Sequence, residues 1–215
     1  MHTPLRLGLI GCGHISRDHR NAIRAHPDTA VLAAACDVDD QRVHAAAADA
    51  DGCQVFTDWA RMVREAALDG VIICLPHAQH LEVGLAALER GMHAMIEKPM
   101  ACTAAQGQQL VNTAARSGVV LMAGQHQRYE PTYRAIRRMV QGGVLGKIHA
   151  ARFDCMQTLR AYAAPPHWFF DGDIAGGGVV RVCEKSWERG RLARPRIYWE
   201  RGRLVCPGVR VGMSA

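Results

Sequence analysis

One stretch near the N-terminus constrains the fold of this 215-residue chain more than any other. An apolar run, Leu5–Ile10, leads into Gly11-Cys12-Gly13, and a segment compatible with a helix begins at Ser16. Gly11 permits a tight turn, and Gly13 lets the backbone come close to a bound group. Ser16 stands where the third glycine of a G-x-G-x-x-G pattern would be and is small enough to replace it. The pattern predicts a strand–turn–helix unit that holds a pyrophosphate at the helix N-terminus, and a turn without a ligand is the alternative.

The remainder of residues 1–123 alternates apolar runs with helical segments, joined by short loops. We expect strands at 5–10, 30–36, 54–56, 70–75, 93–96 and 119–123, and helices at 16–25, 40–50, 59–68, 81–90 and 103–117. This alternation is typical of a doubly wound parallel sheet. We therefore predict an α/β, Rossmann-type domain, in which ligands bind beyond the carboxyl ends of the strands.

A carboxylate follows the second predicted strand. Asp37 lies 24 residues after Gly13, close to the ~20 residues at which an acid holds the ribose hydroxyls of a dinucleotide. A simple turn residue is the alternative. The next residue is Val38, and the nearest cation is Arg42. Because Asp37 would repel a 2′-phosphate, the sequence favours NAD over NADP as the cofactor.

Two further loops at the same edge of the predicted sheet carry polar side chains. The segment 75–80 contains His77 and His80, which are either cofactor contacts or residues of a solvated loop. The segment 97–99 places Lys98 at the end of a buried strand, where an ammonium group is costly to desolvate without a partner or a task. A surface lysine is the alternative. We expect both loops to converge with the glycine turn on one crevice.

A series of motifs runs in order through residues 5–180. They are the segments 8–16, Asp37, 75–80, 91–99 with its Glu-Lys-Pro end, 127–131, 143–148, Trp168 and 176–178. Together they resemble the Gfo/Idh/MocA family, which includes glucose–fructose oxidoreductase and inositol dehydrogenase. The resemblance implies hydride transfer between a sugar or cyclitol alcohol carbon and a nicotinamide cofactor.

The same resemblance implies roles for single residues. Lys98 would hydrogen-bond the reacting hydroxyl and stabilise its alkoxide character, and Pro99 would help to fix it through a cis bond. Arg128, Tyr129 and Trp168 would face the substrate. The implied cofactor-binding residues are Gly11, Gly13, His14, Ile15, Asp37, Leu75, Pro76, His77, His80, Glu97 and Lys98.

Residues 124–180 change in pattern and predict part of a second, α+β domain. An amphipathic helix at 131–141 would turn Ile136, Met139 and Val140 inward, and the run 147–158 is rich in strand-forming residues. The resemblance implies that this would be an incomplete version of the family's second domain, through which homo-oligomers form.

The tail, residues 181–215, differs in composition. It holds nine Lys and Arg against three Asp and Glu, which accounts for the whole net charge of +6. Family members continue here with a G-x-H-x-x-D-type motif whose histidine is the general acid/base, whereas this tail contains neither His nor Asp. A frameshift near codon 181, a divergent natural end and a basic nucleic-acid module are three hypotheses. No nucleic-acid motif is present, which disfavours the third. We favour the frameshift, because the charge and the motif pattern change abruptly at one point and the rest of the second domain is missing, and we expect a poorly ordered tail.

Composition, the N-terminal sequence and the cysteine spacing limit the classes of protein to which the chain can belong. No run of eighteen apolar residues occurs and the N-terminus has no signal-peptide pattern, so we expect a cytoplasmic protein without a membrane span. None of the eight cysteines forms a C-x-x-C pair, which favours reduced thiols over a metal site. The sequence thus predicts an NAD-dependent sugar or polyol oxidoreductase, impaired by the missing histidine. A non-enzymatic NAD-binding protein or inactive remnant is the alternative.

Overall fold

The computed structural model describes residues 3–149, Trp168, Ile174, 198–200 and 203–205. The chain divides into two compact units, Met1–Gln125 and His126–Ala215. The first boundary lies two residues beyond the predicted end of the nucleotide domain at 123. The further division at 180/181 stays a prediction.

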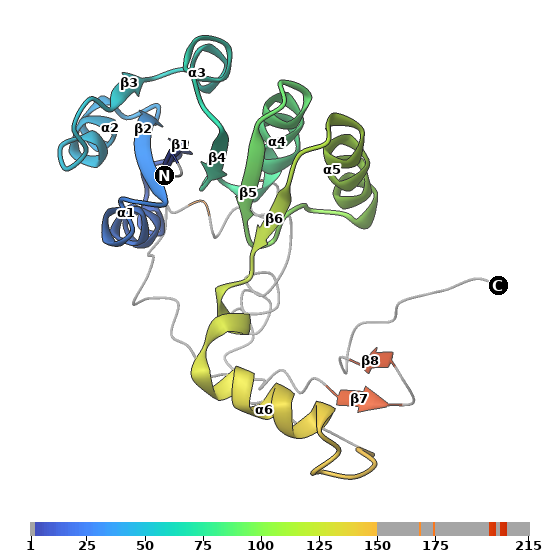
Figure 1. Ribbon diagram of the computed structural model, residues 1–215. Helices are drawn as coiled ribbons and strands as arrows, with labels where there is room; N and C mark the ends of the chain where they lie inside the picture. Colours follow the sequence, from blue (N-terminus) through green and yellow to red (C-terminus); the bar gives the residue numbers. More distant parts are fainter. Residues whose placement is uncertain (1–2, 150–167, 169–173, 175–197, 201–202, 206–215) are drawn as a thin grey trace, which may run out of the picture. The chain divides into compact units, whose positions relative to one another are not determined.

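Unit 1 is built on a six-stranded parallel sheet with the strand order β3-β2-β1-β4-β5-β6 (Figure 1). The strands are β1 (Leu5–Ile10), β2 (Ala30–Cys36), β3 (Gln54–Phe56), β4 (Gly70–Ile73), β5 (His93–Glu97) and β6 (Leu121–Gly124). The helices are α1 (Ser16–Ala25), α2 (Asp40–Ala47), α3 (Trp59–Glu65), α4 (His80–Glu89) and α5 (Ala104–Ser117), with a 3-10 turn η1 (His77–Gln79) before α4. This order is that of a Rossmann fold, and the predicted doubly wound sheet is confirmed.

Two apolar clusters cover the two faces of this sheet. Helices α3, α4 and α5 pack on one face through residues such as Met62, Leu88 and Leu110. Helices α1 and α2 pack on the other, in a cluster that includes Val43 of α2 and Leu9 of β1. All four residues of β4 and six of the seven in β2 are buried, as strands covered on both faces require. The apolar runs seen in the sequence therefore form the centre of the sheet.

The strand order reverses direction between β1 and β4, which are direct neighbours. The end of β1, Gly8–Ile10, pairs with Val71–Ile73 of β4 on one side and with Ala34–Cys36 of β2 on the other. Chain connections leave this point in opposite directions, from β1 toward β2 and from β4 toward β5. Open α/β sheets bind ligands at this topological switch point.

The predicted element bounds hold for β1, α1, β2, β3 and α6, and differ by one to three residues elsewhere. Helices α2 and α3 end three residues before their predicted ends at 50 and 68. Ala66, which follows α3, has extended backbone angles (φ −81°, ψ 134°), so the helix stops although its sequence stays compatible with one. Asp58 and Thr103 cap α3 and α5 with their side chains, and Thr103 therefore precedes the helix that the sequence predicted to begin with it.

Unit 2 contains the described elements η2 (His126–Tyr129), α6 (Pro131–Gln141), β7 (Tyr198–Glu200) and β8 (Arg203–Val205). The inward orientation predicted for α6 is wrong for the described residues, because Ile136, Met139 and Val140 are 41%, 43% and 44% exposed. Within unit 1 the apolar faces of the helices pack on the sheet. In the described part of unit 2 no sheet packs on α6. Most of the predicted β-rich run at 147–158 lies outside the described residues.

Strands β7 and β8 pair antiparallel, with Tyr198 opposite Val205 and Glu200 opposite Arg203. They lie within residues 181–215, the tail for which the sequence predicts poor order, and that expectation stays a prediction. Aromatic and β-branched residues favour strands, and only two residues connect the pair, as in a short hairpin.

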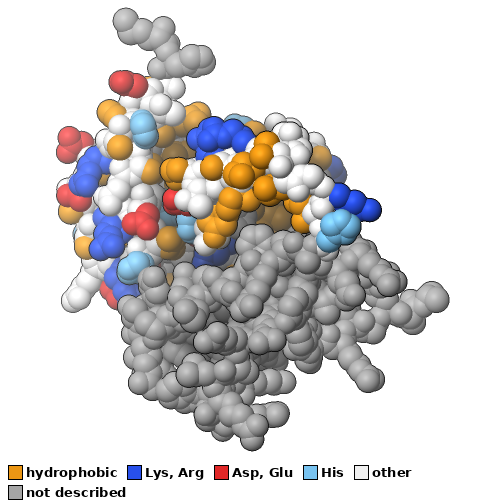
Figure 2. Space-filling view, turned by 90° about the horizontal axis from the view of Figure 1, so that it is seen from below, with side chains coloured by type: hydrophobic (Ala, Val, Ile, Leu, Met, Phe, Trp, Pro, Cys, Tyr) orange, Lys and Arg blue, Asp and Glu red, His pale blue; other side chains and the backbone are white. Residues whose placement is uncertain are grey.

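On the face shown in Figure 2, acidic, basic and histidine side chains of the described residues are interspersed with apolar ones. Among the helices that the structure describes, none combines the length and the apolar character that crossing a bilayer needs.

Candidate functional site

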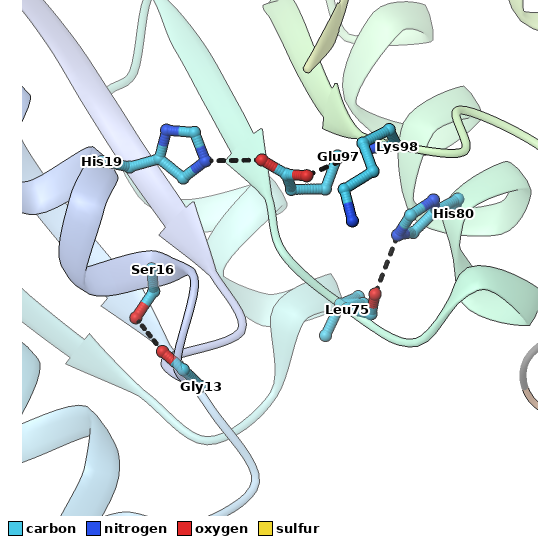
Figure 3. A network of polar contacts seen from close by, with 7 residues as sticks. All are labelled: Gly13, Ser16, His19, Leu75, His80, Glu97 and Lys98. Carbon is cyan, nitrogen blue, oxygen red and sulfur yellow. Dashed lines mark hydrogen bonds and ion pairs between the residues drawn. The ribbon is translucent and has the colours of Figure 1, made fainter. Parts of the chain in front are cut away.

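The glycine turn after β1 has the geometry that the sequence predicts. The Gly11 amide donates to the Cys36 carbonyl (2.8 Å), and its backbone takes a positive φ of 91°. A Cβ added at Gly11 would lie 2.5 Å from the Cys74 carbonyl oxygen, so no side chain fits between the loops after β1 and β4. Ser16 is fully buried and its hydroxyl donates to the Gly13 carbonyl (2.6 Å; Figure 3). The serine side chain therefore links the start of α1 to the turn on its buried side.

The outer side of the same turn is open. A Cβ added at Gly13 would meet nothing within 4 Å. Helix α1 starts after this residue, and no side chain caps its N-terminus. A helix N-terminus without a side-chain cap offers backbone amides and a partial positive charge to an anion.

Asp37 turns toward this loop. One carboxylate oxygen accepts from the Cys12 amide (2.7 Å) and the other from the Asp39 amide (2.9 Å). These two bonds fix the carboxylate at the end of β2, beside the turn after β1. The predicted neighbourhood of Asp37 and the glycine turn is therefore present.

The nearby cation, Arg42, is already paired. Its guanidinium lies 3.2 Å from Asp39, whose side chain also caps α2. Two carboxylates, Asp37 and Asp39, thus stand at the end of β2, and Arg42, the nearest cation in the sequence, is paired with Asp39.

Glu97 lies at the carboxyl end of β5 and is 6% exposed. One carboxylate oxygen contacts the His19 Nε2 of α1 (2.9 Å), and the other accepts from the Lys98 amide (3.1 Å; Figure 3). Burial raises the pKa of this carboxyl, but the hydrogen bonds from His19 and Lys98 and the charges of both residues outweigh it and leave the pKa below its ordinary value. The site therefore holds Glu97 as a carboxylate that joins α1 to β5.

Lys98 follows directly and is exposed. Figure 3 shows its side chain between Glu97 and His80. The peptide bond to Pro99 is cis, as the resemblance implied. Lys98 thus lies at the carboxyl end of a buried strand, at the same edge of the sheet as the glycine turn.

His80 is fully buried at the start of α4. Its Nδ1 lies 2.9 Å from the Pro99 carbonyl oxygen and its Nε2 lies 2.8 Å from the Leu75 carbonyl oxygen. Both ring nitrogens therefore face the backbone of the two loops that follow β5 and β4. His77, Leu75 and Pro76 are half-buried on the loop after β4.

The remaining predicted residues divide between the two units. His14 is exposed and Ile15 is half-buried at the start of α1. Arg128 and Tyr129 are exposed in η2, and Trp168 is half-buried. Because these last three belong to unit 2, their role toward the site in unit 1 stays a prediction.

Sequence reasoning missed His19. Its only signal is its place on α1, three residues after Ser16, which puts both side chains on one face of the helix. The contact with Glu97 spans 78 positions in the chain, and no local pattern indicates it.

These features fit a dinucleotide. The open backbone at Gly13 and the N-terminus of α1 suit a pyrophosphate, and the fixed carboxylate of Asp37 suits ribose hydroxyls. The fold and this arrangement define the class of Rossmann-type dinucleotide-binding domains.

Comparison with known proteins identifies the family within that class. Residues 5–125 match Gfo/Idh/MocA, an oxidoreductase family with an NAD-binding Rossmann fold. The chain belongs to this family, as its motifs predicted.

Three relatives show how far the likeness extends. Inositol 2-dehydrogenase 4 of Saccharopolyspora erythraea is 32% identical over 77% of this chain and 48% of its own length. D-glucoside 3-dehydrogenase of Escherichia coli is 30% identical over 83% of this chain and 50% of its own. The WlbA dehydrogenase of Bordetella pertussis, solved with NADH and UDP-GlcNAcA, has a TM-score of 0.66 at 28% identity over 70% of this chain and 47% of its own. This chain thus spans about half the length of the relatives it matches.

Proposed function

We propose that this chain binds NAD at the crevice formed by the glycine turn, Asp37 and the loops after β4 and β5. The observation that carries the proposal is the bond between the Cys12 amide and the Asp37 carboxylate, because it joins the predicted pyrophosphate and ribose sites. The family assignment supports it.

The charges at the end of β2 favour NAD over NADP. A 2′-phosphate placed near Asp37 would also meet Asp39, and Arg42 is already paired with the latter. Like charges at this distance repel, and no unpaired cation is at hand among the neighbours described above.

The reaction we propose oxidises or reduces a sugar or cyclitol at an alcohol carbon. NAD, when bound, supplies the acceptor or donor of the hydride. Lys98 donates a hydrogen bond to the reacting hydroxyl and stabilises negative charge on its oxygen. The names of the relatives, an inositol and a glucoside dehydrogenase, support this substrate class. Arg128, Tyr129 and Trp168 are proposed to contact the substrate, and homo-oligomers are proposed to form through unit 2.

Turnover by a polypeptide of these 215 residues is proposed to be weak. A well-placed acid/base group contributes ~10²–10⁴-fold to the rate, and residues 181–215 contain no histidine to serve as one. The second candidate, a non-enzymatic NAD-binding protein, rests on the same observation. NADH formation across a panel of cyclitols, sugars and glucosides separates the two, and ordinary dehydrogenase rates would overturn the proposed impairment.

Titration of the purified chain with NADH and NADPH tests cofactor binding directly. We expect NADH to bind at least about tenfold more tightly, a difference of ~1.4 kcal/mol. In Asp37→Ala the preference should shrink, because the repelling carboxylate is removed. Binding of neither nucleotide, or tighter binding of NADPH, would contradict the proposal.

A further inference from the structure

The loops after β4 and β5 meet at His80. Its ring lies between the Leu75 and Pro99 carbonyl oxygens, at 2.8 and 2.9 Å, and the side chain is fully buried. Pro99 is the residue directly after Lys98. A buried ring held at both nitrogens has little freedom, so it fixes the backbone on either side of it.

The number of N–H groups on the ring limits the hydrogen bonds that it can donate. Both acceptors are carbonyls, and a neutral imidazole carries only one N–H, so the doubly protonated ring alone can donate to both. In either protonation state the ring offers no nitrogen to a ligand. The sequence predicts a cofactor contact for His80; the two ring contacts favour a role through the backbone instead.

Position in the sheet decides which part of a dinucleotide this contact would affect. Asp37 and the glycine turn lie at β2 and β1, whereas the loops joined by His80 follow β4 and β5. A dinucleotide across the switch point places its two halves on opposite sides of it. The adenosine half then falls to the β1–β2 side and the nicotinamide half to the β4–β5 side.

We infer that His80 is a positioning residue: by joining the Leu75 and Pro99 carbonyls it holds Lys98 in place for the nicotinamide half of the cofactor. The inference rests on the proposed NAD site and goes further, because it assigns a task to a residue that touches neither cofactor nor substrate. Lys98 itself is exposed, so its position depends on its backbone, which the bond from its amide to Glu97 fixes on one side and the Pro99 carbonyl on the other.

The test compares two ligands. NADH occupies both halves of the site, and ADP occupies only the adenosine half. In His80→Leu we expect the Kd for NADH to rise about tenfold, as the loss of a buried hydrogen bond typically does. The Kd for ADP should stay within a factor of two, which also shows that unit 1 is folded.

Two milder variants keep the test valid if His80→Leu does not fold. The amide groups of His80→Asn and His80→Gln can each donate to one of the two carbonyls. Both should recover part of the NADH affinity. His93→Asn is the matched control, because His93 lies at the opposite, amino end of β5 and is exposed. We expect its NADH and ADP affinities to match those of the unaltered chain.

A readout without cofactor follows Lys98 itself. Reductive ¹³C-methylation labels the lysine amines, and Lys98→Arg assigns the signal. In the His80 variants this signal should shift or broaden, and in His93→Asn it should not.

The outcomes distinguish a failure of this inference from a failure of the proposed function. An equal loss of NADH and ADP binding, an unchanged NADH affinity, or an unchanged Lys98 signal would overturn the positioning role and leave NAD binding standing. If the unaltered chain bound neither nucleotide, the proposed function would fail and this inference with it.

Discussion

At the scale of single residues, Gly11 carries two separate constraints. Its φ of 91° lies in the left-handed region, and an added Cβ would lie 2.5 Å from the Cys74 carbonyl oxygen. Gly52 also has a positive φ, 70°, but nothing lies within 4 Å of its added Cβ. A substitution at Gly52 therefore measures the cost of the positive φ without a steric clash.

We therefore expect Gly11→Ala to destabilise the fold by about 2–4 kcal/mol and Gly52→Ala by about 1 kcal/mol. Gly11→Ala should also abolish NADH binding, because the clash separates the loops after β1 and β4. Urea unfolding of both variants measures the difference. Equal losses in the two would show that the contact with Cys74 is unimportant.

Glu97 gives the fold a pH dependence. Its pKa is lower in the folded chain than its ordinary value of 4.5, so folding favours the carboxylate. The stabilisation of the folded state that comes from this lowered pKa is complete above pH 4.5 and is lost as the pH falls through the folded-state pKa. Glu97→Gln should thus be less stable than the unaltered chain at pH 7 and pH 5.5, with the gap narrowing at pH 4. Thermal unfolding at the three pH values measures it, and a constant gap would contradict the argument.

The five cysteines that the structure describes are free, and two of them, Cys12 and Cys36, are buried. Burial and then the Asp37 carboxylate raise the pKa of Cys12 from 9.0 to about 12, and burial does the same for Cys36. Thiolates are the reactive form. We expect iodoacetamide at pH 7.5 to label the half-buried Cys102 well before Cys12 or Cys36, and unfolding to remove the difference. Mass spectrometry of the labelled peptides reports each site, and rapid labelling of Cys12 in the folded chain would be the contrary result.

At the scale of elements, caps decide where helices begin. The Thr103 hydroxyl accepts from the Gln106 amide (3.2 Å) at the start of α5, and Gly118 ends the helix with a φ of 67°. Thr103→Ala should lower the free energy of unfolding by about 1 kcal/mol, whereas Thr103→Ser should keep most of it. Chemical denaturation compares the three proteins, and a serine variant no better than the alanine one would argue against the cap.

Element bounds could be predicted best where a strong local signal occurs. The glycine turn and the alternating apolar runs placed β1, α1, β2 and β3 at their observed bounds. The ends of α2 and α3 were placed three residues too late, because their helix-compatible sequences continue past the residue at which the backbone turns away. Capping and tertiary contacts, which act on the last turn, decide such ends.

At the scale of the whole molecule, both apolar clusters of the described core consist of residues of unit 1. We expect residues 1–125 expressed alone to unfold cooperatively and to bind ADP with the affinity of the full chain. Calorimetry and ADP titration check this. A fragment that fails to fold would show that unit 2 contributes to the stability of unit 1.

The sequence by itself determined the sheet, the glycine turn and the carboxylate beside it, because each depends on a short pattern: apolar runs, two glycines, and an acid after the second strand. Only the tertiary structure decided what surrounds Lys98. The contact of His19 with Glu97 spans 78 positions and that of His80 with Pro99 spans 19. Such pairs form because the strand order brings distant segments to one edge of the sheet. Side chains with several potential partners receive their final ones from that packing, which no neighbouring residue in the chain specifies.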